Sequence, residues 1–221
     1  MKQIRVCTIL FIGVFCLLLL FNPLNVFADS VTVALESTGG VTSGPGYVYP
    51  YYFSVDGSSV LTPLMCISFK NDIGFGETWT AVTEPIQGNL QYEEAAYIFS
   101  LANAPGATET EIINAQWANW QLFDPDDSNL LSQEPSHSDV ASLLSQAALF
   151  AQDNPNSSLY SQYSIFAPEE VNGSWPAGYG EPQFLIGDPV PEPGSFILLG
   201  SGLLGLAGFL SLRLRRGRRS A

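Results

Sequence analysis

The chain has 221 residues, of which 21 are acidic and eight are lysine or arginine, and its net charge is −13 at pH 7. All the acidic residues lie between Asp29 and Glu192, where Lys70 is the one lysine or arginine. This charge argues against binding to nucleic acid or docking on anionic lipid, and it suits a soluble surface protein.

The first residues have the pattern of an export signal. A basic start is followed by the apolar residues 6–21 and then by Val26-Phe27-Ala28. This order predicts a secretory signal peptide over residues 1–28, cleaved between Ala28 and Asp29. The remaining body, residues 29–188, has about 160 residues, which is enough for one domain with its own core.

The first half of the body reads as β-strands. Alternating or β-branched and aromatic runs predict strands at residues 31–35, 47–55, 64–69 and 77–83. Asp56-Gly57 is a hairpin-turn signal at the end of the second run. Pro50 lies inside that run, which predicts an edge strand or a bulge there.

The middle of the body reads as about three helices. Asn89 is a capping residue for a helix over residues 90–102. Thr108 and Glu111 form the pattern of a capping box for a helix that runs to about Phe123, and Ser136 and Asp139 form a second such pattern for a helix to about Gln152. Residues 124–135 and 171–182 read as surface loops.

Strands return at about residues 161–166 and 183–186. The order of strands, helices and strands predicts an α+β fold, a mostly antiparallel sheet with about three helices inserted mid-chain. The predicted signal peptide and a C-terminal transmembrane helix flank this domain.

The last 33 residues, 189–221, have three parts in a fixed order. A short extended segment is followed by the uncharged, mostly apolar residues 195–212 and then by a basic tail. The apolar run would span roughly 27 Å as a helix, which is enough to cross a hydrocarbon core. The arginines behind it form a stop signal that keeps the tail in the cytoplasm; they are Arg213, Arg215, Arg216, Arg218 and Arg219.

The extended segment is Val190-Pro191-Glu192-Pro193. Two prolines around a glutamate hold the backbone extended, which makes this segment a suitable substrate for a protease or transpeptidase. The order of motif, span and basic tail resembles the PEP-CTERM sorting signal of bacterial envelope proteins. The resemblance implies recognition by an exosortase, which would cut near the motif and release or transfer the body to the cell surface. A plain one-span membrane anchor is the alternative.

One cysteine and one glutamine form the candidate site of the body. Cys7 and Cys16 leave with the signal peptide, so Cys66 has no partner for an internal disulfide. Gln116 lies at helical spacing with Ile113, Trp117 and Trp120, so its amide is expected to face an apolar surface.

A buried amide needs hydrogen-bond partners. Gln116 can bind a strand backbone beside an inert buried thiol, or Cys66 can attack it to form a thioester, or Cys66 can remain a free reactive thiol. Gln116-x-Ala118-x-Trp120 is similar to part of the motif of bacterial surface thioester domains. That resemblance implies a Cys66–Gln116 thioester that surface amines could open.

Other chemistry has little support in the sequence. The one histidine, His137, falls at a helix start and reads as a surface residue rather than a catalytic one. Residues 124–129 resemble a calcium loop in composition, but they lack the glycine and distal glutamate of an EF-hand. We therefore expect no catalytic residue, no metal and no cofactor.

The sequence as a whole predicts a non-enzymatic, exported envelope or extracellular-matrix protein. It would be anchored in the cytoplasmic membrane before sorting and would then lie at the cell surface or outside the cell. Its expected partners are signal peptidase, exosortase, and extracellular polymer or surface amines. An adhesin-like module with a Cys66–Gln116 thioester is the alternative, and a secreted hydrolase is a third class.

Overall fold

The computed structural model describes residues 30–44, 46–71, 73–170 and 181–189, and every structural statement below concerns these residues. The predicted signal peptide with its cleavage site, the Pro-Glu-Pro motif, the apolar run 195–212 and the arginine tail lie outside them. Within the described ranges, no helix is both long enough and apolar enough to cross a membrane.

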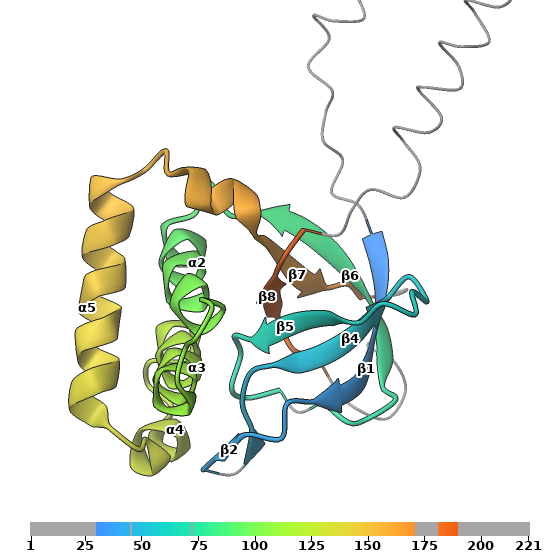
Figure 1. The fold of residues 1–221 in the computed structure, drawn as a ribbon, viewed down its shortest axis with the longest axis horizontal. Coiled ribbons are helices and arrows are strands. Elements are labelled where there is room, and N and C mark those ends of the chain that lie inside the picture. The colour runs from blue at the N-terminus through green and yellow to red at the C-terminus, as the bar shows by residue number, and fades with distance from the viewer. Residues whose placement is uncertain (1–29, 45, 72, 171–180, 190–221) are drawn as a thin grey trace, which may run out of the picture.

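Six antiparallel strands close into a barrel (Figure 1). Around the barrel the order is β1 (Ser30–Thr38), β4 (Tyr51–Val55), β5 (Thr62–Cys66), β8 (Leu185–Gly187), β7 (Ser164–Pro168) and β6 (Thr78–Pro85), which pairs with β1 again. Two short strands, β2 (Thr42–Ser43) and β3 (Gly46–Tyr47), form a separate ribbon between β1 and β4.

The helices form a layer on one side of the barrel, with α5 outermost in Figure 1. In chain order they are α2 (Leu90–Ala102), α3 (Glu109–Phe123), α4 (Ser128–Gln133) and α5 (His137–Asp153), followed by the 3₁₀ helix η1 (Ser158–Gln162). The insertion of this layer between β6 and β7 is the α+β arrangement that the order of elements predicts.

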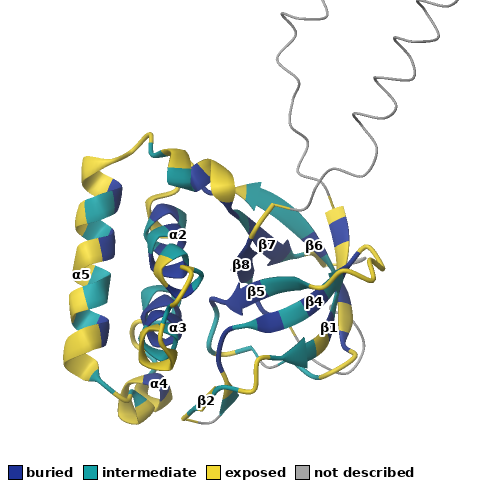
Figure 2. Cartoon of the chain, viewed as in Figure 1, coloured by how far each residue is buried: buried dark blue, intermediate teal, exposed yellow. Residues whose placement is uncertain are grey.

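Two hydrophobic cores result, because the barrel strands beside the helices are covered on both faces. Along β5, Leu64 and Cys66 belong to the core inside the barrel, whereas Met65 and Ile67 belong to the core between the barrel and the helices. Successive side chains of a strand point to opposite faces, which explains this division. Figure 2 shows buried positions on α2 and α3, whereas the outer side of α5 is exposed.

The strand register places both ends of the described body at one end of the barrel. Ser30, the first residue of β1, pairs with Val82 near the end of β6. Gly187, the last residue of β8, pairs with Ser164, which pairs with Pro85 at the end of β6. We call this the exit end, and we call the other end, where β5 finishes and β8 begins, the far end.

Most strands lie where the sequence places them, but several details differ. Residues 161–162, predicted as strand, belong to η1, and residues 67–69 follow the end of β5. The run 47–55 divides into β3 and β4, because Pro50 interrupts it with a cis Tyr49–Pro50 bond. Pro50 marks neither an edge strand nor a bulge, since it precedes β4 and β4 lies between β1 and β5. Asp56 and Gly57 do form a turn, with φ of +51° and +70° and a hydrogen bond from the Ser58 N–H to the Val55 carbonyl, but it is only the first part of the connection from β4 to β5, residues 56–61.

The three long helices are confirmed, and the sequence missed a fourth. The stretch 124–135, predicted as a loop, contains α4, whose N–H groups at Asn129 and Leu130 donate to the Asp127 carboxylate. The capping box of α3 forms as predicted. The one predicted for α5 does not, since Ser136 makes no capping bond and donates to Asp139 instead.

Thr108→Ala is expected to lower the free energy of unfolding by about 1 kcal/mol, because it removes the cap of α3. Hydrogen bonds from Thr108 hold the pKa of Glu111 below its ordinary value. These bonds add to the free energy of unfolding above the pKa that Glu111 has in the unfolded chain, and the contribution is lost as pH falls through the lower pKa of the folded state. The destabilisation caused by Thr108→Ala should therefore be smaller in acid. Urea denaturation at neutral and acidic pH measures both effects.

Ser136→Ala is the matched control, because Ser136 occupies the same position on α5 without a capping bond. It should cost clearly less than Thr108→Ala. Equal costs for the two substitutions would contradict this assignment of the caps.

Candidate functional site

The side-chain amide of Gln116 joins α3 to the backbone at the far end of the barrel. Gln116 is completely buried. Its Nε2 donates to the backbone carbonyl of Cys66 at 2.5 Å, and its Oε1 accepts from the backbone N–H of Tyr49 at 3.1 Å. The amide therefore provides a hydrogen-bond partner for two buried backbone groups, each of which would lower the stability of the fold if it were buried without one.

The thiol of Cys66 belongs to the core inside the barrel rather than to the helix-facing core. It is hydrogen-bonded to the hydroxyl of Tyr51, whose own hydrogen goes to the backbone carbonyl of Tyr47. Burial raises the pKa of Cys66 far above its ordinary value, and the bond to Tyr51 only partly offsets this. Near neutral pH the thiol is therefore protonated and a weak nucleophile.

The structure thus brings Cys66 and Gln116 into contact, but the contact uses the backbone oxygen of Cys66 and not its sulfur. This geometry corresponds to the hydrogen-bonded alternative for Gln116. A reaction between the two side chains stays a prediction.

The predicted apolar face of α3 is confirmed. Trp117 and Trp120 are buried beside Gln116, and Ile113 packs against the same core. The indole nitrogen of Trp117 donates to Ser43 Oγ at 2.9 Å, whereas that of Trp120 has no partner among the described residues.

The acidic stretch that resembles a calcium loop is used in the fold. Asp124 accepts from the backbone N–H of Phe69 at 2.9 Å and pairs with Lys70 Nζ at 2.9 Å, and Asp127 caps α4. In the ranges that the structure describes, no three His, Cys, Asp or Glu side chains gather as metal ligands. His137 is exposed and lies 2.7 Å from Glu134.

Sequence reasoning missed the residues that complete this region. Tyr49 binds Gln116 only through its backbone, so its side chain carries no signal of that role. A pocket with a mixed aromatic and polar lining also opens at the far end of the barrel, between residues that are distant in sequence. Of its lining residues, the sequence singled out Lys70 for its charge, Trp120 on the apolar face of α3, and Asp127 and Asn129 in the acidic stretch, but it did not predict that they meet at a pocket.

Gln116→Leu is expected to lower the free energy of unfolding by about 3 kcal/mol, because it leaves the Cys66 carbonyl and the Tyr49 N–H buried without partners. Cys66→Ala keeps the carbonyl and should cost less, about 1 kcal/mol for the lost sulfur. Urea denaturation measures both variants.

Gln146→Leu on α5 is the control, because Gln146 is exposed and binds only Ser142. It should change stability by less than about 0.5 kcal/mol. A Gln116→Leu variant as stable as this control would contradict the role of the buried amide.

Comparison with known proteins assigns one segment of the chain to a known motif family. Residues 189–216 match the family model of the PEP-CTERM protein-sorting motif. No curated protein and no solved structure matches the chain. The match covers the order of motif, apolar run and arginines that the sequence analysis singled out, and such a motif marks an exported protein that is anchored in the membrane before an exosortase sorts it. The C-terminal segment of this chain is therefore a PEP-CTERM protein-sorting motif.

Proposed function

We propose that the body is a non-enzymatic surface or matrix protein that an exosortase releases or transfers to the outside of the cell. The match of residues 189–216 to the sorting motif is the observation that carries this proposal. The signal peptide 1–28, the membrane span 195–212 and the arginine stop signal are the further parts that such a route requires.

The layout of the body supports this route. Both β1 and β8 meet the rest of the chain at the exit end, so the sorting segment follows directly from that end. The far end of the barrel, with α4 and the β2–β3 ribbon, then lies away from the point of attachment (Figure 1). A protein held in this way presents its far end to the surroundings.

The chemistry of the described residues favours binding over catalysis. The buried thiol of Cys66 has a raised pKa, and His137 is paired with Glu134 on the surface. Asp127, the one carboxylate in the far-end pocket, is bound to the first N–H groups of α4. None of these groups is held as the acid, base or nucleophile of a reaction would be.

Replacing Pro191 and Pro193 together by alanine should block sorting, because the extended segment that the enzyme recognises is lost. In cells with the sorting enzyme, we expect this variant to stay in the cytoplasmic membrane at full length. Membrane fractionation with an antibody against the body measures the distribution.

Glu181→Ala is the control, because Glu181 is an exposed acid upstream of the motif. It should be sorted like the parent. Surface delivery of the double proline variant in the parent amount would contradict the proposal.

Covalent adhesion is a second candidate, and the contact between Gln116 and Cys66 is the observation that favours it. The sulfur of Cys66 would bond to Cδ of Gln116 as the carbon–nitrogen bond breaks, and ammonia would leave with the thiol proton. An amine on another surface could then open the thioester. The position of the thiol in the barrel core means that it must first turn toward α3.

If the thioester forms, the measured mass of the intact purified protein should be about 17 Da below the mass calculated from its sequence, and methylamine treatment should then raise the measured mass. The Cys66→Ala variant should show neither effect. A full sequence mass, with a thiol that reacts only after denaturation, would instead leave Cys66 as a packing residue.

A further inference from the structure

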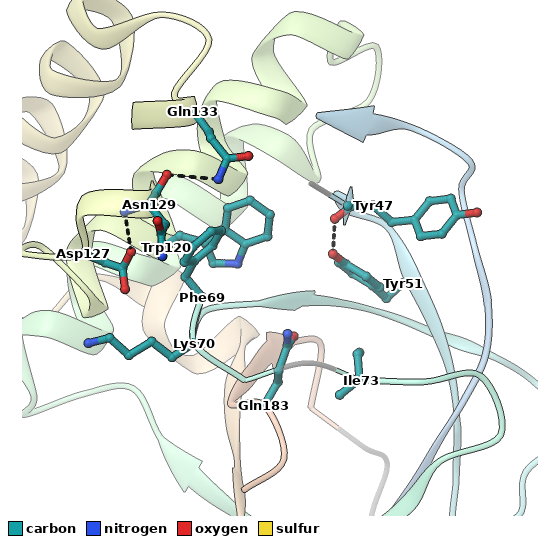
Figure 3. A pocket seen from close by; sticks show the side chains of 11 residues that line it. Tyr47, Tyr51, Phe69, Lys70, Ile73, Trp120, Asp127, Asn129, Gln133 and Gln183 are labelled. Atoms are coloured by element: carbon teal, nitrogen blue, oxygen red, sulfur yellow. Dashed lines mark hydrogen bonds between the residues drawn. The ribbon is translucent and has the colours of Figure 1, made fainter. Parts of the chain in front are cut away.

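A pocket of about 520 Å³ opens at the far end of the barrel, between the β2–β3 ribbon, the loop after β5, and helices α3 and α4 (Figure 3). Its volume falls within the range of pockets that bind small organic ligands. The site is assembled from distant parts of the chain, because Tyr47, Phe69, Trp120 and Gln183 all line it. These elements meet only in the folded protein.

Aromatic rings form one wall of the pocket. Phe69 and Trp120 are in edge-to-face contact, with ring centroids 5.3 Å apart, whereas Tyr47 lies on the opposite side with its ring pointing away from them (Figure 3). Tyr47 also meets Phe75 at 6.1 Å. Tyr47 and Phe75 are 42% and 60% exposed, so the aromatic surface continues from the pocket onto the outside of the protein.

Two nearly buried side chains at the pocket carry polar atoms without partners. Trp120 and Gln183 are only 5% and 7% exposed. Among the described residues, the indole N–H of Trp120 and Oε1 of Gln183 have no hydrogen-bond partner, although Nε2 of Gln183 donates to the Asn71 carbonyl. Both atoms lie beneath the pocket surface. The polar groups that reach the pocket are the exposed side-chain amides of Asn129 and Gln133, and an amide both donates and accepts, which favours a ligand with hydroxyl groups.

The charged groups around the pocket already have partners. Lys70 pairs with Asp124 at 2.9 Å, and the Asp127 carboxylate accepts from the first N–H groups of α4. The body around the pocket is strongly acidic, which repels anionic polymers. The ligand that fits these surroundings is neutral.

We propose that this pocket binds neutral carbohydrate. The apolar C–H face of a sugar ring packs against Trp120 and Phe69, and its hydroxyls meet the exposed amides of Asn129 and Gln133. Tyr47 and Phe75 extend the aromatic surface toward a neighbouring unit, which suits a polymer. The role of such binding in a matrix rests on the proposed function, whereas the binding itself needs only the folded body.

The test uses the full-length chain purified in a detergent without a sugar headgroup. The probes are an array of neutral oligosaccharides that includes cellohexaose, maltohexaose, laminarihexaose and xylohexaose, with hexagalacturonate as the anionic comparison. Titration calorimetry gives affinities for the probes that bind, and a change in tryptophan fluorescence that is lost in a Trp120→Phe variant reports on Trp120. We expect at least one neutral probe to bind and hexagalacturonate not to bind.

Tyr47→Ala should weaken that binding by about tenfold or more, since it removes the exposed ring that, together with Phe75, would contact the neighbouring sugar unit, at little cost to the fold. Tyr52→Ala is the matched control, because Tyr52 lies on β4 outside the pocket, and it should bind like the parent.

Three results would overturn the proposal: no neutral probe binds, Tyr47→Ala binds as tightly as the parent, or the anionic probe binds as well as the neutral ones. Surface delivery is measured separately, so a failure of carbohydrate binding is distinguishable from a failure of sorting.

Discussion

The fold depends on one amide placed where the helical layer meets the barrel. Gln116 donates to the carbonyl of Cys66 and accepts from the N–H of Tyr49, so a single residue of α3 binds the end of β5 and the segment that leads into β4. Both backbone groups would otherwise be buried without partners beneath the helices. The same bonds fix the rotation of α3, which sets Trp117 and Trp120 against the far end of the barrel. The pocket beside Trp120 therefore depends on the same contact.

The sequence predicted the local structure well and the long-range structure poorly. The bounds of α2 and α3 follow from Asn89 and Thr108, because capping side chains act within a few residues. The short helix α4 was missed, because Asp127 stands in a run of acids whose composition resembles a loop. Closure of the barrel could not be predicted, because it depends on pairing between distant strands. β1 pairs with β6, and β5 pairs with β8, which lies more than a hundred residues further along the chain.

The candidate site shows the same division. The burial of Gln116 follows from its spacing with the tryptophans of α3. The actual partners of Gln116 are backbone groups, and no sequence pattern marks a backbone group as a partner. The face of β5 on which the Cys66 thiol lies depends on the register in which β5 pairs with its neighbouring strands, and the sequence does not give that register. The sorting motif could be identified from sequence alone. Its signal is the order of the extended segment, the apolar run and the arginines along the chain, and the family model matches that order.

The described body continues toward the sorting motif from its exit end, where β8 finishes, and the proposed binding pocket opens at the far end. The most direct measurement of the account is the C-terminal peptide of the protein recovered from the surface or medium of its own cells, identified by mass spectrometry. Our account predicts a new C-terminus near the Pro-Glu-Pro motif, without the arginine tail. A surface protein that still ends in the arginines would contradict it.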